Sequence, residues 1–161
     1  MGASLGEPYY VPNIVAGTEV SSTGEGRHVS VLESNLVHVD PGDGLVDKGQ
    51  PVSFGIGWEG AAVGTALESA NAATDIITVD TEGIWRHEVV AGWDVIVGTI
   101  IFITAAGVLV DWPPDEFAHI FGYAVEPMSA GTEVIAIKVH WMDTGIWWIL
   151  FWFWWQGGPK T

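Results

Sequence analysis

The chain contains an internal repeat, and this repeat limits the folds that it can adopt. Residues 63–79 read VGTALESANAATDIITV, and residues 121–137 read FGYAVEPMSAGTEVIAI. Each copy has a short apolar run, a loop of small and polar residues, and a second apolar run rich in β-branched residues, which is typical of a strand–loop–strand unit. One such unit cannot bury its own apolar face, so we expect two copies to close one core as pseudo-symmetric halves.

The two copies align without a gap, which chance similarity between small-residue loops does not readily produce. Asp75 is replaced conservatively by Glu133. We therefore interpret the repeat as a duplication, in which the two glycines near the start of each copy occupy equivalent strand positions. The identical pairs are Gly64 and Gly122, Ala66 and Ala124, Glu68 and Glu126, Ala72 and Ala130, Thr74 and Thr132, and Ile77 and Ile135.

Composition and charge restrict the class of protein. The 161 residues are enough for one domain with its own core, and the 21 glycines suit short strands and turns better than a helical bundle. The net charge of −15 makes nucleic acid an unexpected partner, because phosphate backbones are bound by clustered Lys and Arg. Such a charge is better tolerated where salt screens it. The lack of Cys excludes disulfides and thiol chemistry.

The first 33 residues are rich in Gly, Pro and Ser and show no persistent period. They lack the positively charged start and apolar segment of a secretory signal. Two interpretations stay open for this segment. It is either a disordered leader or an extended arm that becomes ordered against a neighbouring subunit, with Tyr9, Tyr10 and Ile14 among its apolar anchors.

Several apolar runs predict strands outside the repeat. The strongest signal is Val95–Thr104, which is apolar on both faces, as expected for a strand in the middle of a covered sheet. Residues 105–107 predict a tight turn, and residues 112–116 predict an exposed connection because they contain two prolines. Further strands are expected within residues 28–39, 50–54, 84–90 and 108–110.

The chain shows no motif for catalysis, a cofactor or a metal. The five histidines include no pair at metal-ligand spacing, and neither a nucleophile elbow nor a phosphate-binding Gly-rich loop is found. Asp40 and Asp43 lie in a Gly- and Pro-rich turn, but the other oxygen ligands of a calcium loop are missing. We therefore predict no catalytic residue, no cofactor and no metal site, and we do not expect an enzyme.

A series of motifs points to a known family. In chain order these are LVDKGQPVSFG, AAVGTALESA, DIITVDTEGIW, AGWDVIVGTIIFITAAGVLV and FGYAVEPMSAGTEVIAIKVHW. This order resembles that of the small all-β capsid decoration, or cement, proteins of tailed bacteriophages, over Leu45–Trp141. The resemblance implies an all-β fold with a small β-barrel or β-tulip domain. It also implies trimers on the outside of the capsid shell that hold adjacent capsid subunits together.

Two features depart from the family pattern. Trp93 stands where the family usually has a small or polar residue beside the glycine, and the aromatic segment after Trp141 has no counterpart that matches. With these departures, we expect an N-terminal arm over residues 1–33, a β domain over 34–141 and a Trp-rich C-terminal extension over 142–161.

The C-terminal extension contains the run IWWILFWFWW at residues 146–155. A transmembrane helix needs about 20 apolar residues, so this run is too short for a membrane span. Its aromatic and β-branched content favours an added strand. One face of this strand could complete the core, and the other is expected to contact another subunit. The predicted subunit or capsid contacts in this extension are Trp147, Trp148, Phe151, Trp152, Trp154 and Trp155.

Three functions stay open. The first is a structural virion protein on the outer capsid surface, whose partners are the major capsid protein and further copies of itself in a homotrimer. The second is a carbohydrate-binding module, in which exposed tryptophans stack on sugar rings. The third is a membrane-surface protein that uses the aromatic extension, although only Lys160 lies near that extension. The tryptophans considered for sugar binding are Trp58, Trp85, Trp93 and Trp112.

Overall fold

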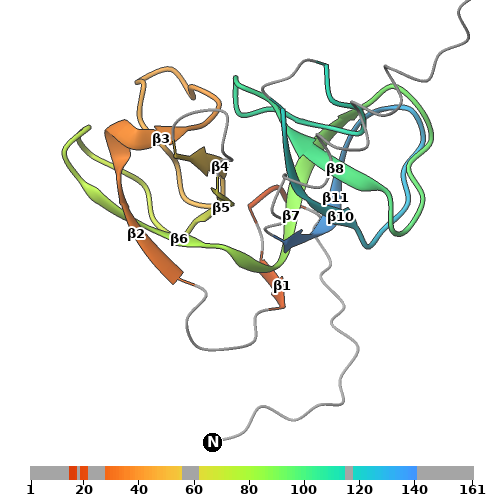
Figure 1. The fold of residues 1–161 in the computed structure, drawn as a ribbon, viewed down its shortest axis with the longest axis horizontal. Helices are drawn as coiled ribbons and strands as arrows, with labels where there is room; N and C mark the ends of the chain where they lie inside the picture. Colours follow the sequence, from red (N-terminus) through yellow and green to blue (C-terminus); the bar gives the residue numbers. More distant parts are fainter. Residues whose placement is uncertain (1–14, 18, 22–27, 56–61, 115–117, 141–161) are drawn as a thin grey trace, which may run out of the picture.

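The structure is a computed structural model, and it describes residues 15–17, 19–21, 28–55, 62–114 and 118–140. In these ranges it is all-β, as predicted, with one short 3₁₀ helix and no α-helix. The strands form two lobes that lie side by side (Figure 1). No helix in the described part of the chain is long and apolar enough to cross a membrane.

The first lobe is a five-stranded antiparallel sheet in the order β2-β6-β5-β4-β3. Its two edge strands follow each other in the chain and are joined by the 3₁₀ helix η1, so the sheet is strongly curved. The elements are β2 (His28–Leu32), η1 (Glu33–Asn35), β3 (Leu36–Val37), β4 (Pro51–Phe54), β5 (Ala62–Ala66) and β6 (Ile76–Asp80).

The second lobe is a closed barrel, because β9 pairs with β7 as well as with β8 and so completes the ring β7-β11-β10-β8-β9. Strand β1 (Glu19–Ser21) pairs with β7 near the start of that strand, whereas β9 pairs near its end. The barrel strands are β7 (Glu82–Ala91), β8 (Ile100–Ile103), β9 (Leu109–Val110), β10 (His119–Ala124) and β11 (Gly131–His140).

The internal repeat forms one hairpin in each lobe, as predicted. In the first lobe Ala66 pairs with Val79, and in the barrel Ala124 pairs with Ile137 at the equivalent positions. The hydrogen bonds just beyond the strands repeat as well. Leu67 N donates to Thr78 O at 2.9 Å, and its counterpart Val125 N donates to Ala136 O at 3.0 Å.

The duplication extends beyond the two hairpins to four strands of each lobe. The first lobe places its strands in the order β2-β6-β5-β4, and the barrel places the corresponding strands in the order β7-β11-β10-β8. Each lobe is thus the same four-stranded unit, with its fourth strand between its first and third. The sequence repeat covers only the third and fourth strands, so the other half of the duplication is recognised from the structure.

Gly64 and Gly122 occupy equivalent positions for a steric reason. A Cβ added at Gly64 would lie 2.6 Å from the carbonyl oxygen of Asp80. At Gly122 it would meet the carbonyl oxygen of Lys138, which is the counterpart of Asp80 in the repeat. A real Cβ does not tolerate such a contact with backbone atoms. Glycine therefore permits the close crossing of the two strands in both hairpins.

Each lobe has its own hydrophobic cluster, and the two lobes also pack on each other. The larger cluster fills the barrel around Phe121 and Ile137, and it includes Val63 from β5 of the first lobe. A hydrogen bond of 3.0 Å joins Thr65 Oγ1 in β5 to His87 Nε2 in β7, and both side chains are buried. The lobes therefore share a packed and hydrogen-bonded junction.

Two predictions about individual residues are wrong. Val95–Thr104 is not one strand, because only Ile100–Ile103 forms β8, and Gly98 adopts a φ of +93° in the loop before it. Trp85 is not an exposed sugar platform. It is 2% exposed in the barrel cluster, and its indole N–H donates to Asp80 Oδ2 at 2.9 Å.

Part of the segment predicted as an N-terminal arm is paired in the sheets. Strand β1 lies on β7, and β2 lies on β6. Just before β1, Gly17 N donates to the carbonyl oxygen of Arg86 at 2.6 Å. A Cβ at Gly17 would lie 3.1 Å from the Cα of Gly49 in the first lobe, so this segment passes close to both lobes.

Candidate interaction surface

The loop between β7 and β8, residues 92–99, lies at the end of the barrel where β7 ends. Figure 1 shows this loop in green beside the blue loop between β10 and β11, on the side of the barrel away from the first lobe. The two loops are joined by a β-bridge, in which Val95 and Met128 exchange backbone hydrogen bonds of 2.9 and 3.0 Å. The bridge fixes the middle of the β7–β8 loop to the barrel.

Side-chain carboxylates hold the β7 end of this loop and join it to the β10–β11 loop. Asp111, which follows β9, accepts hydrogen bonds from Gly92 N at 2.9 Å and from Trp93 N at 3.1 Å. Asp94 accepts one from Ala130 N at 3.0 Å. Toward β8, Gly98 N donates to a carbonyl oxygen of β10 at 2.8 Å. The loop is therefore held by many hydrogen bonds, although it has no regular secondary structure.

The β7–β8 loop, which these hydrogen bonds hold in place, exposes three large apolar side chains. Trp93 is 63% exposed, Ile96 68% and Val97 62%, whereas Val95 between them is 1% exposed and packs in the barrel cluster. Trp112, on the β9–β10 connection, is 59% exposed. Its ring contacts that of Trp93 edge to face, with centroids 5.9 Å apart and an angle of 82° between the planes. We call Trp93, Ile96, Val97 and Trp112 the apolar barrel end.

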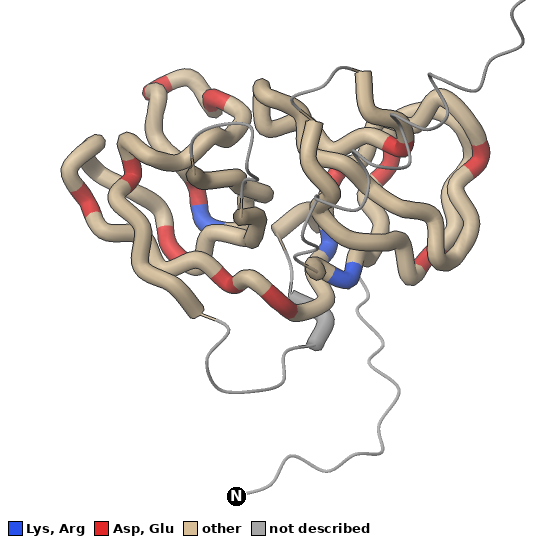
Figure 2. The backbone as a smooth tube through the Cα atoms, viewed as in Figure 1, with Lys and Arg blue, Asp and Glu red and all other residues tan. Residues whose placement is uncertain are grey.

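The charges near the apolar barrel end are negative. Asp94 and Asp111 belong to its loops, and Glu88 and Glu133 lie on the adjoining ends of β7 and β11. The described basic residues lie elsewhere: Lys48 is in the first lobe, Lys138 is in the distant half of β11, and Arg86 is paired with Glu126. Figure 2 agrees, with acidic positions on the outer side of the barrel and the blue segments nearer the junction of the lobes.

An ion pair between Arg86 and Glu126 supports the fold. The Arg86 guanidinium donates to both carboxylate oxygens of Glu126, each at 2.7 Å, and Glu126 also accepts from Ala136 N at 3.1 Å. The hydrogen bond from Arg86 holds the pKa of Glu126 below its usual value. The pair joins β7 to the turn of the repeated hairpin, where Glu68 makes the equivalent backbone contact with Thr78 N in the first lobe.

His87 is structural and lies at the junction of the lobes. Burial lowers its pKa to about 3, so the ring is neutral at pH 7. Its ring packs edge to face on Phe121 with centroids 5.3 Å apart, and it shares the hydrogen bond with Thr65. A side chain so completely enclosed reaches no substrate from solvent.

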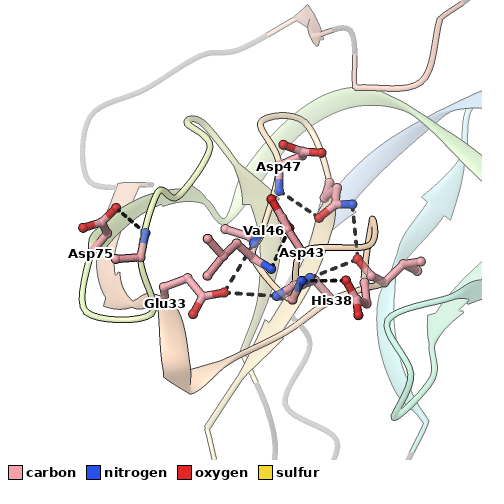
Figure 3. A network of polar contacts seen from close by, with 12 residues as sticks. Glu33, His38, Asp43, Val46, Asp47 and Asp75 are labelled. Atoms are coloured by element: carbon pink, nitrogen blue, oxygen red, sulfur yellow. Dashed lines mark hydrogen bonds and ion pairs between the residues drawn. The ribbon is translucent and has the colours of Figure 1, made fainter.

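In the Asp40–Gly44 turn, the Asp40 carboxylate accepts hydrogen bonds from backbone N–H groups of the same turn. Asp40 Oδ1 accepts from Gly42 N at 2.7 Å and from Gly44 N at 2.8 Å, and these bonds lower the pKa of Asp40. Figure 3 shows the neighbouring network, in which buried Glu33 accepts from the backbone N–H of Val46 and pairs with His38 at 3.2 Å. The described residues contain no group of three or more His, Asp or Glu side chains that could hold a metal ion.

The contact residues predicted from the sequence fall outside the described ranges. These are the N-terminal Tyr9, Tyr10 and Ile14 and the C-terminal Trp147, Trp148, Phe151, Trp152, Trp154 and Trp155; Trp58 is also outside them. As binding residues, Trp93 and Trp112 were considered from the sequence only for sugars. Ile96 and Val97 were missed, because they belong to the run that predicted a strand.

The described residues thus form two related β lobes, whose buried polar clusters support the fold and whose barrel presents exposed apolar side chains at one end. The phage cement protein family model matches residues 33–139 of the 161, from η1 nearly to the end of β11. The chain therefore belongs to the phage cement protein family, which is a family of structural, capsid-associated proteins. No curated protein and no solved structure matches the chain.

Proposed function

We propose that this protein is a capsid decoration protein that binds the outside of a tailed-phage capsid and stabilises it by bridging capsid subunits. The observation that carries this proposal is the family match, which spans most of both lobes and not only the recognisable repeat. The described residues are consistent with this role, since their buried polar groups support the fold and two exposed tryptophans, Trp93 and Trp112, lie on loops held by hydrogen bonds.

Binding and stabilisation can be tested together. Purified protein is mixed with undecorated capsid shells of the phage that encodes it, the shells are sedimented, and the bound copies are counted. The decorated shells should then resist heating or mechanical stress better than bare shells, because bridged subunits must separate together. Shells that bind the protein without any gain in stability would contradict cementing, and shells that bind none would contradict decoration.

We also propose that the protein acts as a homotrimer, with the N-terminal Tyr9, Tyr10 and Ile14 and the aromatic extension as contacts to neighbouring subunits. The apolar content of these two segments supports the proposal, because ordering a segment is offset only when partner surface is available. Light scattering on the free protein and density on decorated shells should show threefold clusters. Single isolated copies in both measurements would exclude the trimer.

The contacts can be tested separately from the trimer. Trp148→Ser/Trp152→Ser/Trp154→Ser should leave the β domain folded and weaken assembly or shell binding, since losing an aromatic hot spot typically costs about 2 kcal/mol or more. Deleting residues 1–14 should weaken attachment while leaving the sheets intact. Normal assembly and normal shell binding by both variants would show that neither segment is a contact.

A further inference from the structure

The apolar barrel end has the properties of a preformed docking surface. Its loops are held by the Val95–Met128 bridge and by the carboxylates of Asp94 and Asp111. Binding through a surface that is already ordered loses little conformational entropy, so more of the contact energy appears as affinity. Tryptophan is the residue most enriched at sites that dominate binding energy, and two tryptophans meet here in direct ring contact.

The local charge indicates the chemistry of the partner. Four carboxylates, those of Glu88, Asp94, Asp111 and Glu133, lie on the same end of the barrel as the exposed apolar side chains. A second copy of this chain, with its net charge of −15, would bring further negative charge against them, which is unfavourable. A partner with an apolar pocket bordered by Lys or Arg would match both the centre and the border of this surface.

We propose that the apolar barrel end is the face that docks on the capsid shell, in an apolar pocket of the shell protein bordered by basic side chains. This assignment rests on the proposed decoration function. It places the trimer contacts on other parts of the protein, because any surface of a second copy belongs to a chain with a net charge of −15. It also gives a role to Trp93, whose large apolar ring the fold leaves 63% exposed.

Sugar binding fits the same surface less well. The rings of Trp93 and Trp112 stand at 82° to each other, so the pair does not offer one flat platform to a sugar ring. The adjoining Ile96 and Val97 are aliphatic and carry no hydrogen-bonding group for sugar hydroxyls. Contact with an apolar protein surface would bury all four side chains favourably.

Two variants test the docking face at independent points. Trp93→Ala/Trp112→Ala removes the ring pair, and Ile96→Ser/Val97→Ser changes the other half of the loop. Each should stay folded, because all four side chains are mostly exposed. The tryptophan variant should weaken binding to undecorated shells by about 30-fold or more, the effect of losing one aromatic hot spot. The Ile96/Val97 variant should weaken it by about 10-fold, because it removes apolar area that docking would bury. Ile76→Ser is the matched control, since Ile76 is 60% exposed on the first lobe; it should bind as the wild type does.

The dependence of shell binding on salt concentration tests the charged border of this surface. Wild-type binding should weaken as NaCl is raised from about 0.05 to 0.5 M, where the Debye length shortens severalfold. Glu88→Gln/Glu133→Gln should weaken binding at low salt and flatten this dependence. Binding by Glu88→Gln/Glu133→Gln that equals the wild type at every salt concentration would overturn the basic border of the pocket.

The outcomes separate the docking face from the function itself. If the wild type binds shells and both loop variants bind equally well, the docking assignment is wrong and the decoration function stands. If the wild type binds no shell, the decoration function fails and the docking assignment with it. Loop variants that change the oligomeric state of the free protein without changing shell affinity would show a contact between copies, and Trp93-dependent binding to a glycan array would show a sugar site; either result overturns the proposal.

Discussion

At the scale of single residues, Gly122 shows why the repeated hairpin keeps its glycine. Gly122→Ala would force a Cβ against the carbonyl oxygen of Lys138, and the strands would have to move apart. We expect the free energy of unfolding to fall by about 1–3 kcal/mol, the usual cost of overpacking, measured by urea denaturation. Gly92→Ala is the control, because its nearest neighbour beyond the adjacent residues is a carboxylate oxygen 3.9 Å away. Equal stability of both variants would contradict the steric role.

His87 makes stability depend on pH. Its pKa is about 3 in the folded protein and about 6.5 in the unfolded chain. Between these values the unfolded chain binds a proton that the folded protein does not, so the free energy of unfolding falls as pH falls, by about 1.4 kcal/mol per pH unit at most. Above about pH 6.5 this contribution is constant.

The measurement compares the wild type with His87→Gln, which does not titrate. Denaturation from pH 7 to 4 should show a steeper loss of stability in the wild type, while carboxylates such as Glu126 contribute equally to both proteins. Parallel curves for the two proteins would mean that His87 becomes protonated in the folded state and is not enclosed as the structure has it.

At the scale of the elements, the two repeated hairpins provide their own control for the Arg86–Glu126 pair. Glu126→Gln should lower the free energy of unfolding by about 2 kcal/mol, because it leaves the Arg86 guanidinium, whose side chain is 10% exposed, without its counter-ion. Glu68→Gln changes the equivalent residue, where Ser30 occupies the register position of Arg86, and should cost much less. Equal losses measured by thermal denaturation would mean that the backbone contact, and not the ion pair, matters.

The same elements show what sequence reasoning can reach. The hairpins were predictable because loop residues such as Glu68 and Glu126 make specific contacts and so remain alike. The equivalence of β2 with β7 and of β4 with β8 was not predictable from the sequence. These strands need only apolar side chains and backbone pairing, which dissimilar sequences can provide. The prediction of one strand over Val95–Thr104 was wrong for a related reason, because an apolar run does not reveal that the chain turns at Gly98. For the same reason, Ile96 and Val97 were not recognised as surface residues from the sequence.

At the scale of the whole molecule, the lobes are expected to unfold together. Val63 of the first lobe is completely buried in the barrel cluster, and Thr65 shares its hydrogen bond with His87 across the junction. Neither lobe can lose its structure without exposing apolar surface of the other. We therefore expect the two related halves to act as one cooperative unit, in which the apolar barrel end belongs to the barrel alone.

The net charge gives the last prediction. With 20 acidic and 5 basic residues, the folded protein brings many carboxylates close together, and this repulsion weakens on unfolding or in salt. Raising NaCl from about 0.02 to 0.5 M, where the Debye length falls well below 10 Å, should therefore raise the melting temperature, by about 2–4 °C for each kcal/mol of repulsion relieved. The rise should level off once the charges are screened, and KCl should act as NaCl does, because screening depends on ionic strength and not on the ion. A melting temperature that stays constant or falls with salt, measured by calorimetry on the free protein, would show that ion pairs such as Arg86–Glu126 outweigh the repulsion.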